Sequence, residues 1–216
     1  MSGQLSLFLS DFLPRFLRGM AVNFEIAIIA LVIGLALGLL LALGRYRGGL
    51  ARGTAASAVA LMRAAPTFVV MFFLLNAIPR DMTLFGMPLA LSGIMAVALS
   101  LVPYSASYIS DAGLDAMRHW HDGSRLGALL FLPNVTRAFF VLVMSSSAGA
   151  AIGVTEAISV ILRRAEHLPS LDERLLLFAF GIVMFGIPLQ LGFALVSYVQ
   201  RRLNRISRPA EPAKAA

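Results

Sequence analysis

Residues 20–44 read MAVNFEIAIIALVIGLALGLLLALG, and Asn23 and Glu25 carry the only strongly polar side chains in this run. About 20 apolar residues are enough for a helix to cross the roughly 30 Å hydrocarbon core of a bilayer. No water is available there to bond the backbone, so such a run must form its own hydrogen bonds as a helix. The run therefore predicts a transmembrane helix.

Four more apolar runs follow, at about residues 55–78, 88–109, 126–154 and 174–199. Hydrophobic residues make up 59% of the chain and charged residues 13%, about half the charged share of a soluble domain. Alternating ten-residue patterns, the signature of a membrane β-barrel, are absent. We expect an all-α membrane protein with about five transmembrane helices. Arg63 and Pro66 lie early in the second run, so its start should be amphipathic or broken.

The organisation we expect has three parts. Residues 1–19 form an interfacial amphipathic helix, because Phe12 and Phe16 lie on one helical face and Asp11 and Arg15 lie elsewhere. Pro14 should bend this helix. Residues 20–203 form the transmembrane domain. Residues 204–216 form a flexible basic tail. No cleavable signal peptide is expected, because the first arginine is Arg15.

Five spans place the two termini on opposite sides of the membrane, and basic residues indicate which side is which. With the tail inside, the inner segments hold ten basic residues: Arg45, Arg47, Arg52, Arg118, Arg125, Arg201, Arg202, Arg205, Arg208 and Lys214. The outer segments hold six: Arg15, Arg18, Arg80, Arg163, Arg164 and Arg174. The excess favours the N-terminus outside and the C-terminus inside.

A polar island at residues 111–125, DAGLDAMRHWHDGSR, interrupts the apolar runs. With the orientation above it is an interior loop that a water-soluble partner could grip. His119 and His121 with Asp122 could suggest a metal, but residues two apart diverge on a helix and no further ligands are near, so no metal is expected.

Several classes of function are disfavoured by the sequence. Cysteine is absent, which excludes disulfides and thiolate metal sites. The phosphate-binding pattern G-x-x-x-x-G-K-[ST] and the hydrolase patterns G-x-S-x-G and H-E-x-x-H are missing, so we expect no enzyme and no cofactor. The net charge of +7 sits at the ends of spans rather than on one soluble face, so nucleic acid is not an expected partner.

Small residues are dense in two runs and predict close helix packing. Gly34 and Gly38 are one turn apart in the first run, and the fourth run holds consecutive serines followed by small residues. For Ser145, Ser146 and Ser147 a second reading stays open, a hydroxyl-lined path for a polar solute.

Several motifs occur in an order that resembles one family, the membrane permease subunits of ATP-binding-cassette importers for polar amino acids. Arg63-Ala64-Ala65-Pro66 followed by Phe72-Phe73 is similar to the family's R-G-T-P…F-F segment. Ser107-Tyr108-Ile109-Ser110-Asp111 resembles its A-Y-L-A-E. Residues 132–154, LPNVTRAFFVLVMSSSAGAAIGV, align without gaps on L-P-P-L-x-N-x-F-I-x-L-L-K-D-T-S-L-x-S-x-I-G-V, and the similarity covers about residues 12–203.

The resemblance implies a type I importer bundle that works with other subunits in a bacterial inner membrane. These would be an ATP-binding subunit, a second permease subunit and a periplasmic solute-binding protein, with membrane lipid around them. The family's E-A-A-x-x-x-G docking segment is reduced here, because His121, Asp122 and Gly123 replace its first three residues and the following stretch is several turns shorter. The resemblance thus assigns ATPase docking to a shortened coupling loop at about 110–131, with Trp120, His121, Asp122, Gly123, Arg125 and Gly127.

A second departure lies in the fourth run, where Met144 and the three serines replace the family's K-D-T-S. Arg137 and Arg63 are candidates for charges that line the translocation pathway, with Pro66 beside the second; snorkelling to the interface would explain both arginines equally well. The solute is expected to be polar, an amino acid or a related compound.

Two rival functions remain. A permease-like chain with an assembly or regulatory role would fit the reduced docking loop. An ion-coupled secondary transporter would need carboxylates within the spans, and Glu25 is the only candidate well inside one. Glu25 fits an interfacial position near a helix N-terminus more simply than a proton relay.

Overall fold

The computed structural model describes residues 8–77, 83–84, 87–88 and 91–206. These residues are helical except for a short antiparallel pair, β1 (Thr83–Leu84) and β2 (Met87–Pro88), and the connecting turns. The helices are the π-helical η1 (Phe8–Phe12), α2 (Leu13–Arg47), α3 (Gly49–Ala64), α4 (Thr67–Ala77), α5 (Gly93–His121), α6 (Arg125–Leu129), α7 (Phe131–Ser145), the 3₁₀-helical η2 (Ser146–Ile152), α8 (Ala157–Glu166) and α9 (Leu171–Ile206).

Within these residues, four helical stretches are long and apolar enough to cross a membrane, at Ser10–Arg47, Gly93–His121, Gly127–Ile152 and Leu171–Arg202. The bent pair α3 and α4 makes a fifth if it is one broken span. The expected all-α bundle with about five spans is confirmed. The predicted span positions are close to those observed, although the observed helices are longer at most ends.

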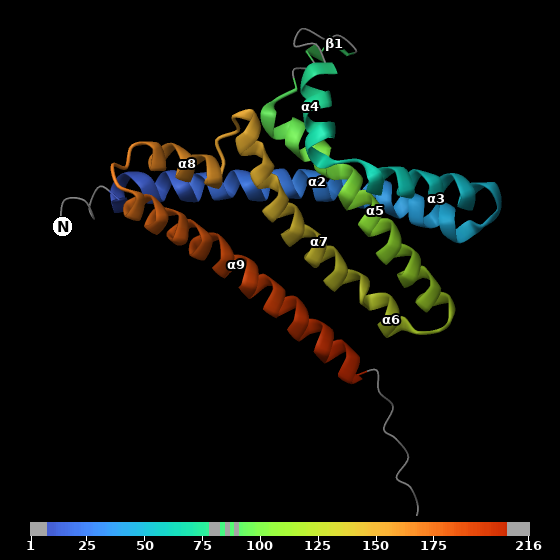
Figure 1. Cartoon of the computed structure of the whole chain (residues 1–216). Helices are drawn as coiled ribbons and strands as arrows, with labels where there is room; N and C mark the ends of the chain where they lie inside the picture. The colour runs from blue at the N-terminus through green and yellow to red at the C-terminus, as the bar shows by residue number, and fades with distance from the viewer. Residues whose placement is uncertain (1–7, 78–82, 85–86, 89–90, 207–216) are drawn as a thin grey trace, which may run out of the picture.

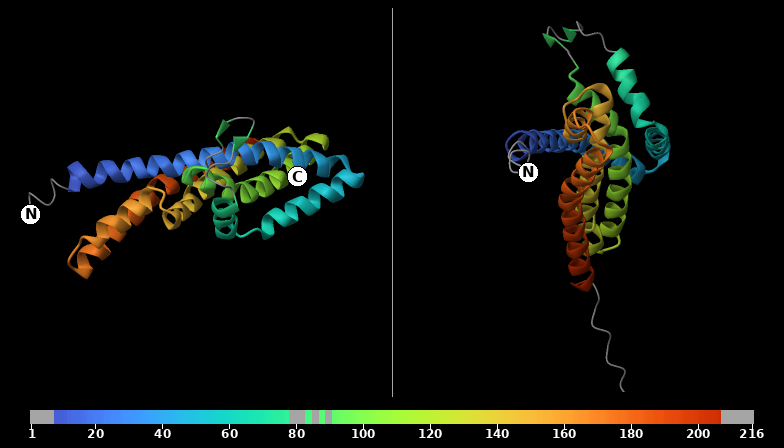
Figure 2. Two further views of the ribbon diagram at one scale, coloured as in Figure 1. Left: turned by 90° about the horizontal axis from the view of Figure 1, so that it is seen from above. Right: turned by 60° about the vertical axis from the view of Figure 1, so that its left-hand side comes forward.

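The long helices fall into two directions. Figures 1 and 2 show α5, α7 and α9 running side by side, whereas α2 crosses them. The helix α2 packs most extensively on α5 and also contacts α3, α7 and α8. At 1.5 Å per residue its 35 residues extend about 52 Å, well beyond the hydrocarbon core, so α2 must be strongly tilted or project from the bilayer.

Gly34 and Gly38 provide the contact between α2 and α5. A Cβ atom on Gly38 would lie 2.7 Å from the carbonyl oxygen of Ala106 and from Cβ of Ile109. A Cβ atom on Gly34 would collide with the side chain of Ser105. The small residues of the first run therefore pack helices, as the sequence predicts.

The N-terminal segment corrects one expectation. No break separates this segment from the first span at residue 19, because the π-helical η1 runs directly into α2 and Ser10–Arg47 form one helical stretch. Pro14 is the second residue of α2 and lies where the π-helical η1 changes into the α-helix. The apolar face of this segment packs on protein, since Phe12 and Phe16 are buried and both contact Phe180 of α9.

The second run is broken, as Pro66 predicts. Ala65 has the extended backbone typical of a residue before proline, and α4 leaves α3 at 93°. Figure 1 shows α4 turning away from the line of α2 and α3.

Three further segments differ from the sequence-based picture. The polar island is not an extended loop, because Asp111 to His121 form the last turns of α5 and Arg125 begins α6. The fourth span is α-helical only to Ser145 and then tightens into η2. The outer polar segment after it contains a helix of its own, α8.

Some expectations lie outside the described residues. These are the first seven residues, the turn residues Arg80 and Asp81, and the tail from residue 207 onward.

The glycine contact leads to a test. Gly38→Ala should destabilise the protein by about 1–3 kcal/mol, because the added methyl group meets the backbone of α5. Thermal unfolding in detergent measures the loss. Gly186→Ala in α9 is the matched control, since a Cβ there meets nothing within 4 Å and alanine favours a helix by up to about 1 kcal/mol. Equal melting temperatures for the two variants would contradict the assigned contact.

Candidate functional site

Asp111 on α5 joins three helices through charge. Its carboxylate accepts a 2.7 Å hydrogen bond from the guanidinium of Arg45 on α2 and also pairs with Arg63 on α3. Arg45 donates a second bond of 3.1 Å to Ser110 Oγ. Because the Arg45 side chain is only 20% exposed, its partner matters more than that of a surface arginine.

A cavity of about 390 Å³ lies beside this ionic cluster. The break between α3 and α4 forms one wall with Arg63 and Pro66, and α5 forms the other with Tyr104, Ser107 and Asp111. Two of the residues predicted for the pathway therefore meet at one cavity with polar and aromatic walls. The sequence contained no signal that Asp111 would face them.

The residues predicted to dock an ATPase lie at the junction of α5 and α6. A turn of three residues, Asp122, Gly123 and Ser124, connects the two helices. Gly123 has φ +80°, which favours glycine, and its N–H donates to the carbonyl of Trp120. Ser124 Oγ then caps α6 by accepting from the N–H of Gly127 at 3.1 Å.

The exposed surface of this junction is aromatic and charged. The Trp120 side chain is 64% exposed, and the ring of His121 lies edge-on to Tyr46 of α2 at 6.4 Å between centroids. Asp122 and Arg125 are exposed as well. A protruding tryptophan at the end of a helical bundle is suited to contact another protein.

The remaining pathway candidates do not share one surface. Arg137 on α7 is exposed and makes no ion pair with any described residue. Ser145 is half-buried, and Ser147 lines an apolar cavity that α9 also borders. Ser146 is fully buried. The three hydroxyls therefore do not form a single row along a path in this conformation.

Ser146 belongs instead to a buried polar network. The amide of Asn23 on α2 donates to Ser146 Oγ at 2.8 Å and to Glu156 Oε2 at 3.0 Å. Asn23 Oδ1 in turn accepts from the N–H of Ala157 at 3.2 Å. These bonds connect α2, η2 and the start of α8, and all three polar side chains are inaccessible to solvent.

Glu156 is the N-terminal cap of α8. Its carboxylate accepts the N–H groups of Ser159 at 2.7 Å and Ile158 at 2.9 Å, and Ser159 Oγ bonds back to the Glu156 backbone. Burial raises the pKa of Glu156, and the bonds from Ile158, Asn23 and Ser159 lower it again only in part. With its oxygens occupied in this way, Glu156 has a structural role rather than that of a proton carrier.

Sequence reasoning missed this network. A signal for each half was present, because Asn23 is a polar residue within an apolar run and Glu156 stands three residues before Ser159 at the start of an amphipathic helix. Glu25, the carboxylate that the sequence did single out, is exposed. The pairing of Asn23 with Glu156 spans 133 residues and could not be read from either signal.

The geometry can be compared with known proteins. No family model and no curated protein sequence matches this chain. One solved structure is similar, the crystal structure of an amino acid ABC transporter with histidines. The TM-score is 0.67 at 19% sequence identity, and the match covers 91% of this chain and 97% of the other. At that identity the similarity establishes the fold alone, a helical membrane bundle like that of the matched chain.

The ionic cluster gives a prediction for Asp111→Asn. The variant leaves the partly buried Arg45 without a carboxylate and should lose about 1 kcal/mol of stability. Asp115→Asn is the control one turn along the same helix. Its carboxylate is 68% exposed and 3.9 Å from Arg118, so the effect should stay within about 0.5 kcal/mol. Chemical unfolding of the two variants in detergent gives the difference, and equal losses would refute a special role of Asp111.

The buried network gives a second prediction. Glu156→Gln replaces one acceptor oxygen with an NH₂ group that faces donors, which should cost about 1–3 kcal/mol. Glu166→Gln, at the exposed end of the same helix, should be neutral.

The pH dependence of that loss has a definite sign. A carboxyl group whose pKa is raised on folding stabilises the folded state most when it is protonated, and this contribution falls as pH rises through the raised pKa. The difference in melting temperature between the wild type and Glu156→Gln should thus be larger at about pH 5 than at about pH 8. The opposite trend would mean that hydrogen bonding outweighs burial.

Proposed function

We propose that this chain is the membrane permease subunit of an ATP-binding-cassette importer and forms half of the translocation pathway for a polar solute. The observation that carries the proposal is the fold, which matches a chain of an amino acid ABC transporter over nearly the full length of both. The order of the sequence motifs supports the same family. The structure that matches holds histidines, so an amino acid is the first class of solute to test.

ATP hydrolysis belongs to other subunits in this proposal, since the chain has no phosphate-binding loop. The partners are an ATP-binding subunit, a second permease subunit (a related chain or a second copy) and a periplasmic solute-binding protein. The site is a bacterial inner membrane, with the N-terminus outside and the C-terminus inside. Binding and hydrolysis of ATP in the partners would shift the bundle between outward and inward access.

The cavity between the α3–α4 break and α5 is the part of the translocation pathway that we propose this chain contributes. Arg63, Pro66, Tyr104 and Asp111 border it, and they combine charge, hydroxyl groups and aromatic surface. Backbone that leaves the helix at membrane depth is tolerated where it borders such a cavity. Arg137 and the serines, apart from the buried Ser146, would join the pathway only after a rearrangement of α7 and η2.

The α5–α6 junction is the proposed contact with the ATP-binding subunit. Its three-residue turn is short for a docking element, which also keeps the second candidate function open, a permease-like chain that assembles with a transporter without transmitting force. The two functions differ in what the chain recruits and in whether uptake depends on the junction.

Co-expression with candidate ATP-binding and sister permease subunits tests the proposal. Trp120→Ala should lower recovery of the ATP-binding subunit at least several-fold, because a truncated interface tryptophan often removes 2 kcal/mol or more, about 30-fold in affinity. Tyr198→Ala removes a comparably exposed aromatic group from α9 and is the matched control. Replacing both Asp122 and Arg125 with Ala should act in the same direction as Trp120→Ala.

Uptake of labelled histidine into proteoliposomes that contain the complex provides the functional readout. Unchanged recovery of the ATP-binding subunit and unchanged uptake in the junction variants would show that the junction does not couple ATP hydrolysis to transport. That result would favour the assembly role. If the chain recruits no ATP-binding subunit even with its sister permease present, the importer proposal fails.

A further inference from the structure

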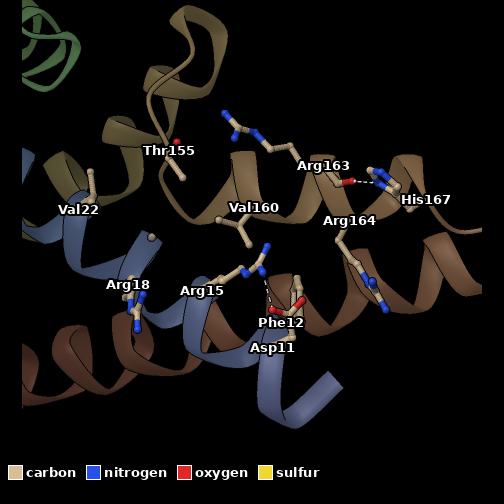
Figure 3. Close-up of a pocket in the computed structure, with 11 residues that line it drawn as sticks. Asp11, Phe12, Arg15, Arg18, Val22, Thr155, Val160, Arg163, Arg164 and His167 are labelled. Carbon is tan, nitrogen blue, oxygen red and sulfur yellow. Dashed lines mark hydrogen bonds and ion pairs between the residues drawn. The ribbon is translucent and has the colours of Figure 1, made fainter. Parts of the chain in front are cut away.

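A second cavity, of about 570 Å³, lies at the opposite end of the molecule from the α5–α6 junction, where the first turns of α2 pass α8 (Figure 3). Gly19 permits this close passage, since a Cβ atom there would lie 2.7 Å from the backbone nitrogen of Ala157. Six charged or ionisable residues line the cavity: Asp11, Arg15, Arg18, Arg163, Arg164 and His167.

The cavity carries a large excess of positive charge. Its lining holds four arginines and one carboxylate, that of Asp11, which pairs with Arg15 at 2.6 Å. The guanidinium groups of Arg18, Arg163 and Arg164 form no ion pair with any residue that the structure describes. His167 Nδ1 donates to the carbonyl of Arg163 at 2.8 Å, which leaves Nε2 as a further polar atom of the wall.

Part of the lining of the same cavity is apolar. Phe12, Val22 and Val160 line it, and Phe12 and Val160 belong to a hydrophobic cluster that also holds Phe16 and Leu177. A lining that combines basic and apolar groups matches an amphiphile with an anionic head.

The arginines are spread along the cavity rather than focused on one point. Figure 3 shows Arg15 and Arg18 on the α2 side, with Arg163 and Arg164 leaving α8 in different directions. A small free anion would be held best by converging donors, whereas a headgroup with its glycerol and acyl chains extends along the cavity. The spread therefore favours a lipid over inorganic phosphate.

The position agrees with a lipid as well. The cavity lies at one end of the first span, beside the short connection from α8 into the last span. With the orientation proposed above, four of the six outer basic residues gather at this one cavity, which explains most of the positive charge on the side where it is normally scarce.

We propose that this cavity binds an anionic phospholipid, with its headgroup extended along the spread guanidinium groups of Arg18, Arg163 and Arg164 and its acyl chains along Phe12 and Val160. Basic clusters between membrane helices recognise anionic headgroups through the same physics. The bound lipid would hold α8 against α2 and neutralise the unpaired arginines. The binding needs only the folded chain in a bilayer, so it does not depend on ATP coupling or on the transported solute.

The absence of cysteine allows a local measurement. Thr155→Cys places a single thiol at an exposed position on the cavity wall, and a fluorophore attached there reports on nearby lipid. The full chain is reconstituted in phosphatidylcholine nanodiscs that contain a small fraction of either brominated phosphatidylglycerol or brominated phosphatidylcholine with the same acyl chains. The anionic lipid should quench at roughly tenfold lower mole fraction than the neutral one.

Replacing Arg163 and Arg164 with Gln should abolish this preference, and replacing both with Lys should retain most of it. Arg201→Gln with Arg202→Gln is the matched control, because it removes an adjacent arginine pair and the same charge from the far end of α9. Circular dichroism and size exclusion verify that each variant is folded.

Three outcomes would overturn the proposal. Equal quenching by the two lipids would show that the cavity does not prefer anionic lipid and would favour an acidic protein partner instead. A preference that survives in the Arg163/Arg164 glutamine variant would place the lipid elsewhere. Relief of quenching by millimolar inorganic phosphate at constant ionic strength would identify a soluble anion as the ligand.

Discussion

The close approach of α2 to α5 is the contact on which the other helices depend. Apolar side chains gain little by leaving lipid for each other, so helices in a bilayer associate through tight van der Waals contact. Gly34 and Gly38 bring the two backbones together, and α2 extends in both directions from that crossing. Its C-terminal part meets α3 and the Arg45–Asp111 pair, and its N-terminal part meets α8 and the Asn23–Glu156 network. One crossing thus connects the two polar centres of the molecule.

Much of the fold follows from the sequence because hydropathy and proline act locally. The apolar runs identify the spans, and Pro66 predicts the break between α3 and α4. The expectations that failed concern where one helix ends and the next segment begins. The sequence suggested a separate interfacial helix over residues 1–19, but η1 runs directly into α2, and α2 continues to Arg47. The charges of residues 111–125 suggested a loop, but α5 continues to His121, because exposed polar residues are compatible with a helix that leaves the membrane.

The candidate sites were less predictable, since their chemistry lies in pairings between distant residues. Charge and a helix break in an apolar run made Arg63 and Pro66 pathway candidates, and the structure puts both on one cavity with Asp111. The run of three serines left two readings open, helix packing or a path, and Ser146 is buried and bonded to Asn23. The sequence pattern of a run of hydroxyl residues is the same whether the run lines a path or supports a helix junction. Only the partner, Asn23 from 123 residues earlier in the chain, distinguishes the two.

The helix break at Ala65–Pro66 has a consequence for insulation of the membrane. Pro66 has no N–H, so the carbonyl of Met62, four residues earlier, has no helical donor, and both residues border the cavity beside α5. Only water can satisfy such a carbonyl when no protein donor reaches it. The cavity beside the break thus combines an unpaired backbone carbonyl with the charged groups of Arg63 and Asp111, a surface that lipid covers only at a cost in free energy. In the proposed importer the second permease subunit would cover this surface, so permeability to ions would be controlled by assembly.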